Sequence, residues 1–377
     1  MIPAVKVKES QRTGLYVHLP FCLRRCTYCA FAISTNANLE IPYMEALAHE
    51  VRHRGEAWGP SLSTIYLGGG TPSRSSFSAL KNLFSGIRDR FDTRSVFEVT
   101  LEANPEDVDP AAVEIWSGLG VDRISLGVQS FHDDELETIG RSHGRNGALR
   151  AISILQRAQI DFSLDLIAGL PHQTSRSFRE SLEFVVEASP RHVSVYMLDL
   201  EPGSPLEKLV EKKRVDIPAD SIVAEMYREA VATLEANGIH QYEVSNFAQD
   251  GFRAIHNSSY WDGAPYLGVG LSAHSFDGEM RYANHRNMRR YIELATRSGD
   301  PVESSEKLDQ NLRREEKLLL NLRRTEGITS DELDRLAGKK GEEWLDRGRE
   351  QGWIRQDRIA LTTEGFLLSN SLIGELF

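Results

Sequence analysis

The sequence predicts an α/β fold, a partial, TIM-like (β/α)6 barrel with a C-terminal helical, winged-helix-like module. Three observations support this prediction. Short β-branched runs alternate with amphipathic helical stretches from residue 14 to about residue 200, and a loop rich in Gly, Pro or charged residues follows each run. From about residue 306 the chain becomes charged and helical in pattern. Six βα units are enough for an open barrel but fewer than the eight of a closed one.

The six β-branched runs are expected to form parallel strands, in the order 15–19, 64–67, 96–101, 123–128, 162–167 and 192–198. Between them lie helical patterns with apolar residues three and four apart, such as Phe77, Leu80 and Phe84. In such folds the reactive groups gather on the loops after the strands. These loops read HLPFC, GGGTPS, EANPED, GVQSF, GLPHQT and DLEPGSPL.

Three segments are expected along the chain. Residues 1–237 form the barrel core and end in a helix from about Asp220, with Gly238 as its stop. Residues 238–305 form an irregular segment rich in aromatics, Asn and His. Residues 306–377 form the C-terminal module, with a short hairpin in WIRQDRIALT. Acidic residues among the basic ones disfavour DNA binding by this module, so we interpret it as a packing domain.

One glycine pattern in the second segment is interpreted as a packed loop. The stretch Gly268-Val-Gly270-Leu-Ser-Ala273 fits the spacing of a dinucleotide-binding motif. No clear strand precedes it and no βαβ unit with a later acid follows it, so a dinucleotide site is not expected.

The composition excludes several classes of protein. The 377 residues are 40% hydrophobic and carry a formal net charge of −11, which argues against a nucleic-acid-binding protein. No run of about 18 apolar residues is present, so we expect no integral membrane protein. The N-terminus, MIPAVKVKESQRTG, lacks the apolar segment of a signal peptide. We therefore expect a cytoplasmic location.

All three cysteines of the chain, Cys22, Cys26 and Cys29, lie together after the first predicted strand. In a reducing compartment such a cluster more often binds metal or acts in catalysis than forms disulfides. A [4Fe–4S] cluster normally takes four thiolates, so three would leave one iron free to bind a small molecule. Two alternatives are three cysteines packed as small hydrophobes, and a zinc site completed by His18.

The spacing C-x3-C-x2-C, with Tyr28 before the last cysteine, resembles the signature of the radical S-adenosylmethionine (SAM) superfamily. In that superfamily the open iron of a [4Fe–4S] cluster binds the amino and carboxylate groups of SAM, and the reduced cluster releases a 5′-deoxyadenosyl radical from it. The resemblance therefore implies both cofactors, and the six βα units match the partial barrel of the superfamily.

The resemblance also implies a set of SAM contacts near the strand ends. Consecutive glycines let backbone approach a ligand, although a tight turn needs them equally. For polar residues at strand tips, the alternative is a hydrogen-bonded loop anchor. The expected cofactor-binding residues are Tyr16, Gly68, Gly69, Gly70, Thr71, Glu102, Gln129, Arg141 and Asp165.

The ordered motifs HLPFC, YLGGGTPS, LEANPE, RISLGVQSF, DLIAGLP and GSPL resemble oxygen-independent coproporphyrinogen III oxidase and its relatives over most of the chain. The oxidase has a further cysteine two positions after the third, where this chain has Phe31, and a longer segment before the cluster. Both departures argue against coproporphyrinogen III dehydrogenase activity. That oxidative decarboxylation, or another radical SAM reaction on a tetrapyrrole such as ring opening, stays as the alternative function.

A motif in the second segment indicates a haem chaperone. His256-Asn257-Ser-Ser-Tyr260-Trp261 matches the H-N-x-x-Y-W motif of the HemW-type chaperones, where the histidine is implicated in haem binding. The resemblance implies that His256, Tyr260 and Trp261 bind haem, and histidine is a common axial ligand of haem iron. It also implies haem transfer to acceptor proteins such as membrane-bound respiratory enzymes. The alternative is a core histidine hydrogen-bonded near packed aromatics. His274 is a weaker candidate, interpreted as a buried polar anchor.

Overall fold

The centre of the fold is a row of six parallel strands, seen in a computed structural model that describes residues 13–377. Residues 1–12, most of the polar N-terminus considered above, lie outside the described residues. All six predicted strands are confirmed, with ends that differ from the prediction by at most a few residues. They are β1 (Thr13–Leu19), β2 (Leu62–Gly69), β3 (Glu98–Ala103), β4 (Arg123–Gln129), β5 (Asp161–Ala168) and β6 (His192–Met197).

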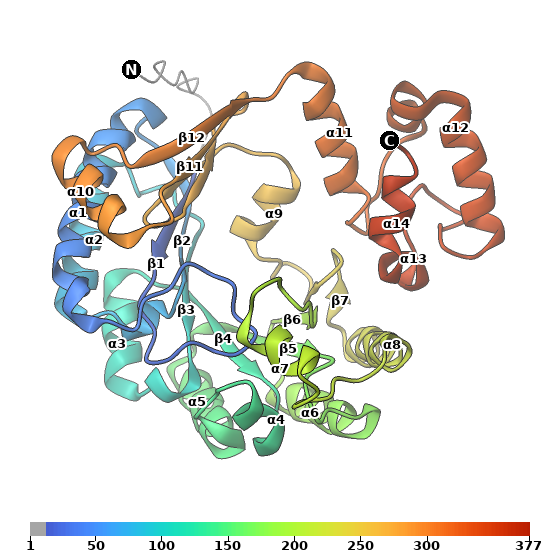
Figure 1. Ribbon diagram of the computed structural model, residues 1–377, viewed down its shortest axis with the longest axis horizontal. Helices are drawn as coiled ribbons and strands as arrows, with labels where there is room; N and C mark the ends of the chain where they lie inside the picture. The colour runs from blue at the N-terminus through green and yellow to red at the C-terminus, as the bar shows by residue number, and fades with distance from the viewer. Residues whose placement is uncertain (1–12) are drawn as a thin grey trace.

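Helices follow the strands and cover the outer face of the sheet, which curves as a partial barrel (Figure 1). In α2, the Ser76 hydroxyl accepts a hydrogen bond from the Ala79 N–H, and Leu80, Phe84 and Ile87 form the buried face. The helices of this part are α1 (Glu40–Gly55), α2 (Phe77–Arg90), α3 (Pro110–Leu119), α4 (Asp133–Thr138), α5 (Gly144–Ala158), α6 (Ser175–Ala188), α7 (Pro205–Glu211) and α8 (Asp220–Ala236).

The inner face of the sheet is polar. Along β1 the apolar Leu15, Val17 and Leu19 are fully buried in the main core, whereas most residues on β3 to β6 that point inward are polar, and several of them are small. Four of them, Thr100, Ser125, Ser163 and Ser194, line one cavity. The interior of this barrel is therefore open to polar ligands, unlike the packed interior of a closed TIM barrel.

Residues after α8 extend the sheet at both edges. The twelve strands lie in the order β12-β11-β10-β9-β1-β2-β3-β4-β5-β6-β8-β7, and β9 is parallel to β1. The added elements are β7 (His240–Gln241), β8 (Asn246–Ala248), α9 (Ile255–Trp261), β9 (Tyr266–Val269), β10 (His274–Phe276), β11 (Met280–Asn284), α10 (Met288–Ser298) and β12 (Val302–Lys307).

The glycine pattern interpreted above as a loop begins inside a strand, so that interpretation was wrong at Gly268, which lies in β9. A Cβ on Gly268 would lie 1.9 Å from the carbonyl oxygen of His274, so only glycine fits the tight β9–β10 connection. The glycine thus serves backbone packing between two strands.

A buried ion pair joins α1 to the added strands. Glu50 and Arg54 form a 2.9 Å salt bridge with side chains 0% and 7% exposed. The Glu50 carboxylate also accepts hydrogen bonds from the Gly270 N–H and the Asn284 amide, while Arg54 donates to Ser275 Oγ. These partners lie on or beside β9 to β11, and the Tyr291 hydroxyl of α10 also donates to Glu50 at 2.7 Å, so the pair fixes both these strands and α10 against the first helix.

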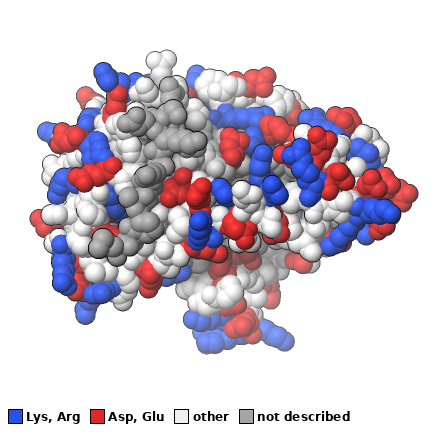
Figure 2. All heavy atoms as spheres, turned by 90° about the horizontal axis from the view of Figure 1, so that it is seen from above, with Lys and Arg blue, Asp and Glu red and all other residues white. Residues whose placement is uncertain are grey.

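The C-terminal helices pack around a second hydrophobic cluster and lie beside the barrel at the right of Figure 1. They are α11 (Gln310–Asn321), α12 (Ser330–Glu350), α13 (Thr363–Leu367) and α14 (Ser369–Gly374). Two antiparallel bridges, between Ile328 and Ile359 and between Ile354 and Leu361, add a small β element. Within residues 13–377, no helix combines the length and apolar character that a membrane span requires. On the face drawn in Figure 2, acidic and basic side chains are interspersed.

Candidate functional site

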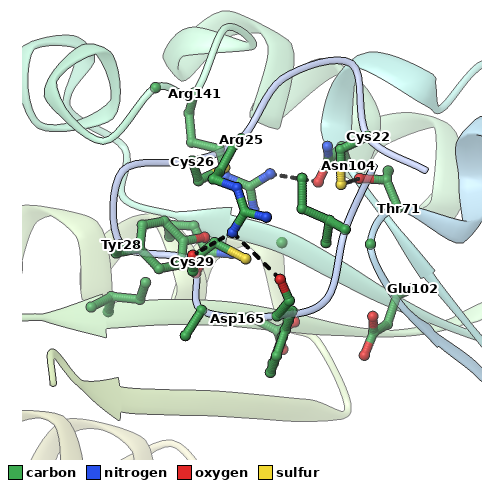
Figure 3. A pocket seen from close by; sticks show the side chains of 18 of the residues that line it. Cys22, Arg25, Cys26, Tyr28, Cys29, Thr71, Glu102, Asn104, Arg141 and Asp165 are labelled. Carbon is green, nitrogen blue, oxygen red and sulfur yellow. Dashed lines mark hydrogen bonds between the residues drawn. The ribbon is translucent and has the colours of Figure 1, made fainter. Parts of the chain in front are cut away.

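A cavity of about 420 Å³ lies at the C-terminal ends of the parallel strands, under the loop that follows β1 (Figure 3). All three cysteines line it. The same cavity contains predicted cofactor-binding residues from the C-terminal parts of β2 to β5 and from the segments that follow them. The predicted residues that the structure brings together here are Cys22, Cys26, Cys29, Gly69, Gly70, Thr71, Glu102, Gln129, Arg141 and Asp165.

Backbone hydrogen bonds hold the cysteine loop in place from several sides. The Cys22 N–H donates to the Ser34 carbonyl at 3.0 Å, and the Cys29 N–H donates to the Cys26 carbonyl at 3.2 Å. Thr27 receives a hydrogen bond on its carbonyl from the Leu206 N–H at the start of α7. The loop is thus fixed in part by α7, about 180 residues further along the chain, and the thiols are presented on a defined backbone.

The three thiols are free, and they share one small volume with a guanidinium group. Burial raises the pKa of Cys22 to about 11. The hydrogen bond that the Thr71 hydroxyl donates to its sulfur, at 3.4 Å, acts to lower the pKa but is outweighed. Burial likewise raises the pKa of Cys29. A cation or metal centre at the site would therefore be needed to hold these sulfurs as thiolates at neutral pH.

The zinc alternative requires His18 beside the cysteines, and the structure places His18 elsewhere. Its Nε2 hydrogen-bonds the Ala32 carbonyl at 2.9 Å, and its Nδ1 pairs with the Tyr16 hydroxyl at 3.0 Å. His18 lines a second cavity rather than that of the cysteines. Across residues 13–377, no group of three or more His, Cys, Asp and Glu side chains is arranged to hold a single metal ion.

Glu102, at the end of β3, faces the cavity between two donors. The Gly69 N–H donates to Oε2 at 3.0 Å and the Tyr66 hydroxyl donates to Oε1 at 2.7 Å. Burial raises the pKa of Glu102 to about 7, against the hydrogen bond from Tyr66. The side chain can therefore change charge near neutral pH, which suits a group that accepts hydrogen bonds from a ligand.

Arg141 and Asp165 contribute buried polar atoms without partners. Arg141 Nη1 donates to Asn104 Oδ1 at 2.5 Å, and Asp165 Oδ2 accepts from Ser125 Oγ at 2.9 Å. Among the described residues, however, nothing hydrogen-bonds Arg141 Nε or Asp165 Oδ1, although both atoms are buried. Buried polar atoms are almost always paired in folded proteins, so these two atoms, which belong to residues lining the cavity, are available to pair with a polar ligand.

The backbone around the cavity is strained at one residue and tightly packed at two. Gln129 has a φ of +70° at an irregularity in the pairing of β4 with β5, a conformation that non-glycine residues rarely adopt. A Cβ on Gly70 would lie 2.5 Å from the carbonyl carbon of Pro20, and one on Gly69 would lie 2.5 Å from the His18 ring. The packing of the cysteine loop alone therefore requires both glycines.

Two of the predicted cofactor-binding residues do not line the cysteine cavity. Tyr16 lines the second and third cavities instead, and its ring stacks on Tyr66. Gly68 is buried, and a Cβ there would lie 2.8 Å from the Tyr66 ring. Both stay predictions as SAM contacts, and the geometry gives them a packing role.

The H-N-x-x-Y-W motif forms α9, which lies against the inner face of the sheet (Figure 1). His256 is 1% exposed; its Nδ1 pairs with Thr64 Oγ1 at 2.7 Å and its Nε2 with the Tyr260 hydroxyl at 2.8 Å. Burial lowers the pKa of His256 to about 3. The arrangement fits the alternative of a hydrogen-bonded core histidine. The indole nitrogen of Trp261 is buried with no partner among the described residues.

Sequence reasoning missed several residues of the cysteine cavity and misplaced one histidine. Asn104 holds Arg141 and lies in the quoted loop EANPED, so its position after β3 was the available signal. Phe31 is 65% exposed and lines both the first and second cavities.

His274, interpreted above as a buried anchor, is exposed, which corrects that interpretation. It alternates with Ala273 and Ser275, whose side chains take the buried positions.

Comparison with known proteins agrees with this geometry. The family model of the radical SAM superfamily matches residues 16–185. The chain is 35% identical to the heme chaperone HemW of Bacillus subtilis, covering 95% of this chain and 97% of the relative. It is 32% identical to the heme chaperone HemW of Escherichia coli, covering 97% of each.

Among solved structures, coproporphyrinogen III oxidase (HemN) from Escherichia coli shares the fold. The two superpose with a TM-score of 0.85 at 20% identity, over 99% of this chain and 92% of that one. The similarity extends through the C-terminal helices and confirms the α/β partial barrel. The full-length relatives, at 35% and 32% identity, show that this chain belongs to the HemW family of the radical SAM superfamily.

Proposed function

We propose that this protein holds a [4Fe–4S] cluster on Cys22, Cys26 and Cys29, binds SAM beside it, and carries haem to acceptor proteins. The observation that supports the two cofactors is the convergence of all three cysteines and the strand-end polar residues on one cavity. Three thiolates leave one cluster iron for a small molecule. The second ligand suited to the site is polar, because Arg141 Nε and Asp165 Oδ1 are buried without partners among residues 13–377.

The residues of the cavity have distinct proposed roles toward these cofactors. The cluster, when bound, supplies an electron for SAM cleavage. Arg141 is buried beside the cysteines, so its positive charge offsets the negative charge of the thiolates. Glu102 and Asp165 offer carboxylate oxygens to the hydroxyl and amino groups of SAM. Gln129, held at positive φ, presents its backbone and amide to the same space.

Haem as cargo is supported by the relatives, which are named heme chaperones and cover nearly the whole chain. We propose a division of labour along the sequence: residues 1–237 hold the cluster and SAM, residues 238–305 carry the haem ligand, and residues 306–377 act as a packing domain. The acceptors are membrane-bound respiratory haemoproteins, approached from the cytoplasm, where reducing conditions keep the cysteines free.

Anaerobic reconstitution with iron, sulfide, SAM and haem tests the proposal. We expect about four non-haem irons, about four sulfides and one haem per chain. The non-haem iron and the sulfide should be lost in Cys26→Ser. Stoichiometric zinc or absence of sulfide would refute the cluster. Haem transfer is followed by the absorbance of an apo b-type haemoprotein after mixing, and no transfer would refute the chaperone role.

A second arm addresses the oxidase alternative. The reconstituted protein is incubated with coproporphyrinogen III, SAM and a reductant, and the tetrapyrroles are separated by chromatography. We expect no protoporphyrinogen IX, because Phe31 stands where the oxidase has its additional cysteine. Formation of that product would assign the oxidative decarboxylation to this protein.

A further inference from the structure

A second cavity, of about 320 Å³, opens on the inner face of the sheet next to the cysteine loop. Its floor comes from β1, β9 and β10, and its wall comes from Ala30, Phe31 and Ala32, directly after Cys29. Tyr260 of α9 and Tyr266 of β9 meet there edge to face, with ring centroids 4.7 Å apart. The cavity therefore offers several aromatic surfaces to a flat ligand.

His274 faces this cavity, and its imidazole nitrogens have no hydrogen-bond partner among residues 13–377. The residue is exposed. Its backbone is nevertheless fixed, because Ala273 and Ser275 on either side are buried and Ser275 Oγ hydrogen-bonds both the N–H and the carbonyl of Gly268. A rigid backbone with a free imidazole nitrogen is the arrangement that an axial iron ligand requires.

Arg286 adds a positive charge at the rim of the same cavity. Its Nη2 donates to the Ala30 carbonyl at 2.6 Å, and the side chain is exposed. In the described part of the chain it forms no salt bridge with a carboxylate, so its remaining N–H groups are available to an anionic ligand. Aromatic walls, a free histidine and a rim arginine together match an iron porphyrin with carboxylate side chains.

His256 lies outside this cavity, on the far side of Tyr260. Both of its ring nitrogens are engaged, by Thr64 and by Tyr260, and it lines the third cavity instead. Iron could reach His256 only after the Tyr260 hydrogen bond was broken and that side chain displaced. The accessible imidazole belongs to His274.

We propose that haem binds in this second cavity with His274 as an axial ligand of its iron and Arg286 beside its carboxylates. This assignment rests on the proposed haem binding. His256 acts as a positioning residue, because its hydrogen bond orients Tyr260 against the bound macrocycle. Phe31 and Ala30 line both this cavity and that of the cysteines, so bound haem lies against the loop that holds the cluster.

Haem titration of the full-length protein tests the assignment, with absorbance for affinity and electron paramagnetic resonance of ferric haem for ligand identity. His274→Ala should weaken binding about tenfold or more and remove the histidine signature. His256→Ala should weaken binding with the signature retained, and His256→Gln, which keeps a hydrogen bond to Tyr260, should restore affinity. His240→Ala is the matched control, since this exposed histidine lies outside the cavity.

Added imidazole provides a further readout that does not depend on the folding of the variant. It should restore the histidine signature in His274→Ala, because the truncated side chain leaves room next to the iron. The assignment is overturned if His256→Ala loses the signature while His274→Ala keeps it, or if both variants keep it. Absence of haem binding by the unmodified protein would instead refute the proposed function itself.

Discussion

Replacing Arg54 by leucine removes the cation of the buried pair that joins α1 to β9–β11. In the folded protein the Glu50 carboxylate would then stay 0% exposed with no positive charge beside it. Breaking a buried, hydrogen-bonded pair by removing one partner costs about 3–5 kcal/mol. Ser275 and the Gly268 carbonyl also lose a donor, so we expect a value in the upper half of that range.

The cost of Arg54→Leu should depend on pH. Burial raises the pKa of Glu50, and Arg54 opposes this shift. Without Arg54 the folded-state pKa rises further above the ordinary value of 4.5. An acid with a raised folded pKa contributes its stability below the unfolded value and loses it as pH rises through the folded value. The deficit should therefore be larger at pH 8 than at pH 5.

Urea denaturation followed by circular dichroism measures this cost, with the free energy extrapolated to water. The double variant Glu50→Gln, Arg54→Leu should recover part of the loss, because no buried charge remains. The exposed pair Arg290–Glu293 is the control, and its disruption should change stability by less than about 0.5 kcal/mol. A loss below 1 kcal/mol for Arg54→Leu, or the same loss at both pH values, would refute the reasoning.

Three further outcomes concern the cysteine cavity. Gly70→Ala should reduce iron and sulfide incorporation in anaerobic reconstitution, because its Cβ would displace Pro20 and the cysteine loop; unchanged counts would show that the loop adapts. SAM affinity, measured by calorimetry, should rise from pH 6 to pH 8, because the Glu102 carboxyl, whose pKa is raised to about 7, becomes charged in that interval. Glu102→Gln should abolish this rise. Asn104→Ala should weaken SAM binding about tenfold by releasing Arg141, and an unchanged dissociation constant would remove that positioning role.

The parallel core was predictable because its strands are β-branched runs long enough to show a pattern, and each is followed by a distinctive loop. The strands added at the two edges of the sheet could not be predicted in this way. β7 to β10 have two to four residues each, and β12, VESSEK, is almost entirely exposed, so neither length nor apolar alternation marks them. Their formation depends on pairing with β1 and β6, which are distant in sequence.

The predicted cofactor-binding residues divided in the same way. Residues near the C-terminal end of a predicted strand, such as Glu102 and Asp165, could be placed because parallel strands bring their ends to one edge. Tyr16 and His256 could not, because which cavity a side chain reaches depends on the packing of α9 across the sheet. The exposure of His274 follows from its alternation with Ser275, a pattern that a three-residue strand is too short to reveal.

The place of β1 between β2 and β9 has a consequence for synthesis of the protein. The strand that leads into the cysteine loop is made early, yet one of its two neighbours begins only at Tyr266. Until that residue leaves the ribosome, one edge of β1 has no partner, and α1 lacks the groups that surround its ion pair. The cysteine loop is therefore expected to reach the geometry proposed for the cluster only after Tyr266 has been made, and not in the nascent N-terminal half of the chain.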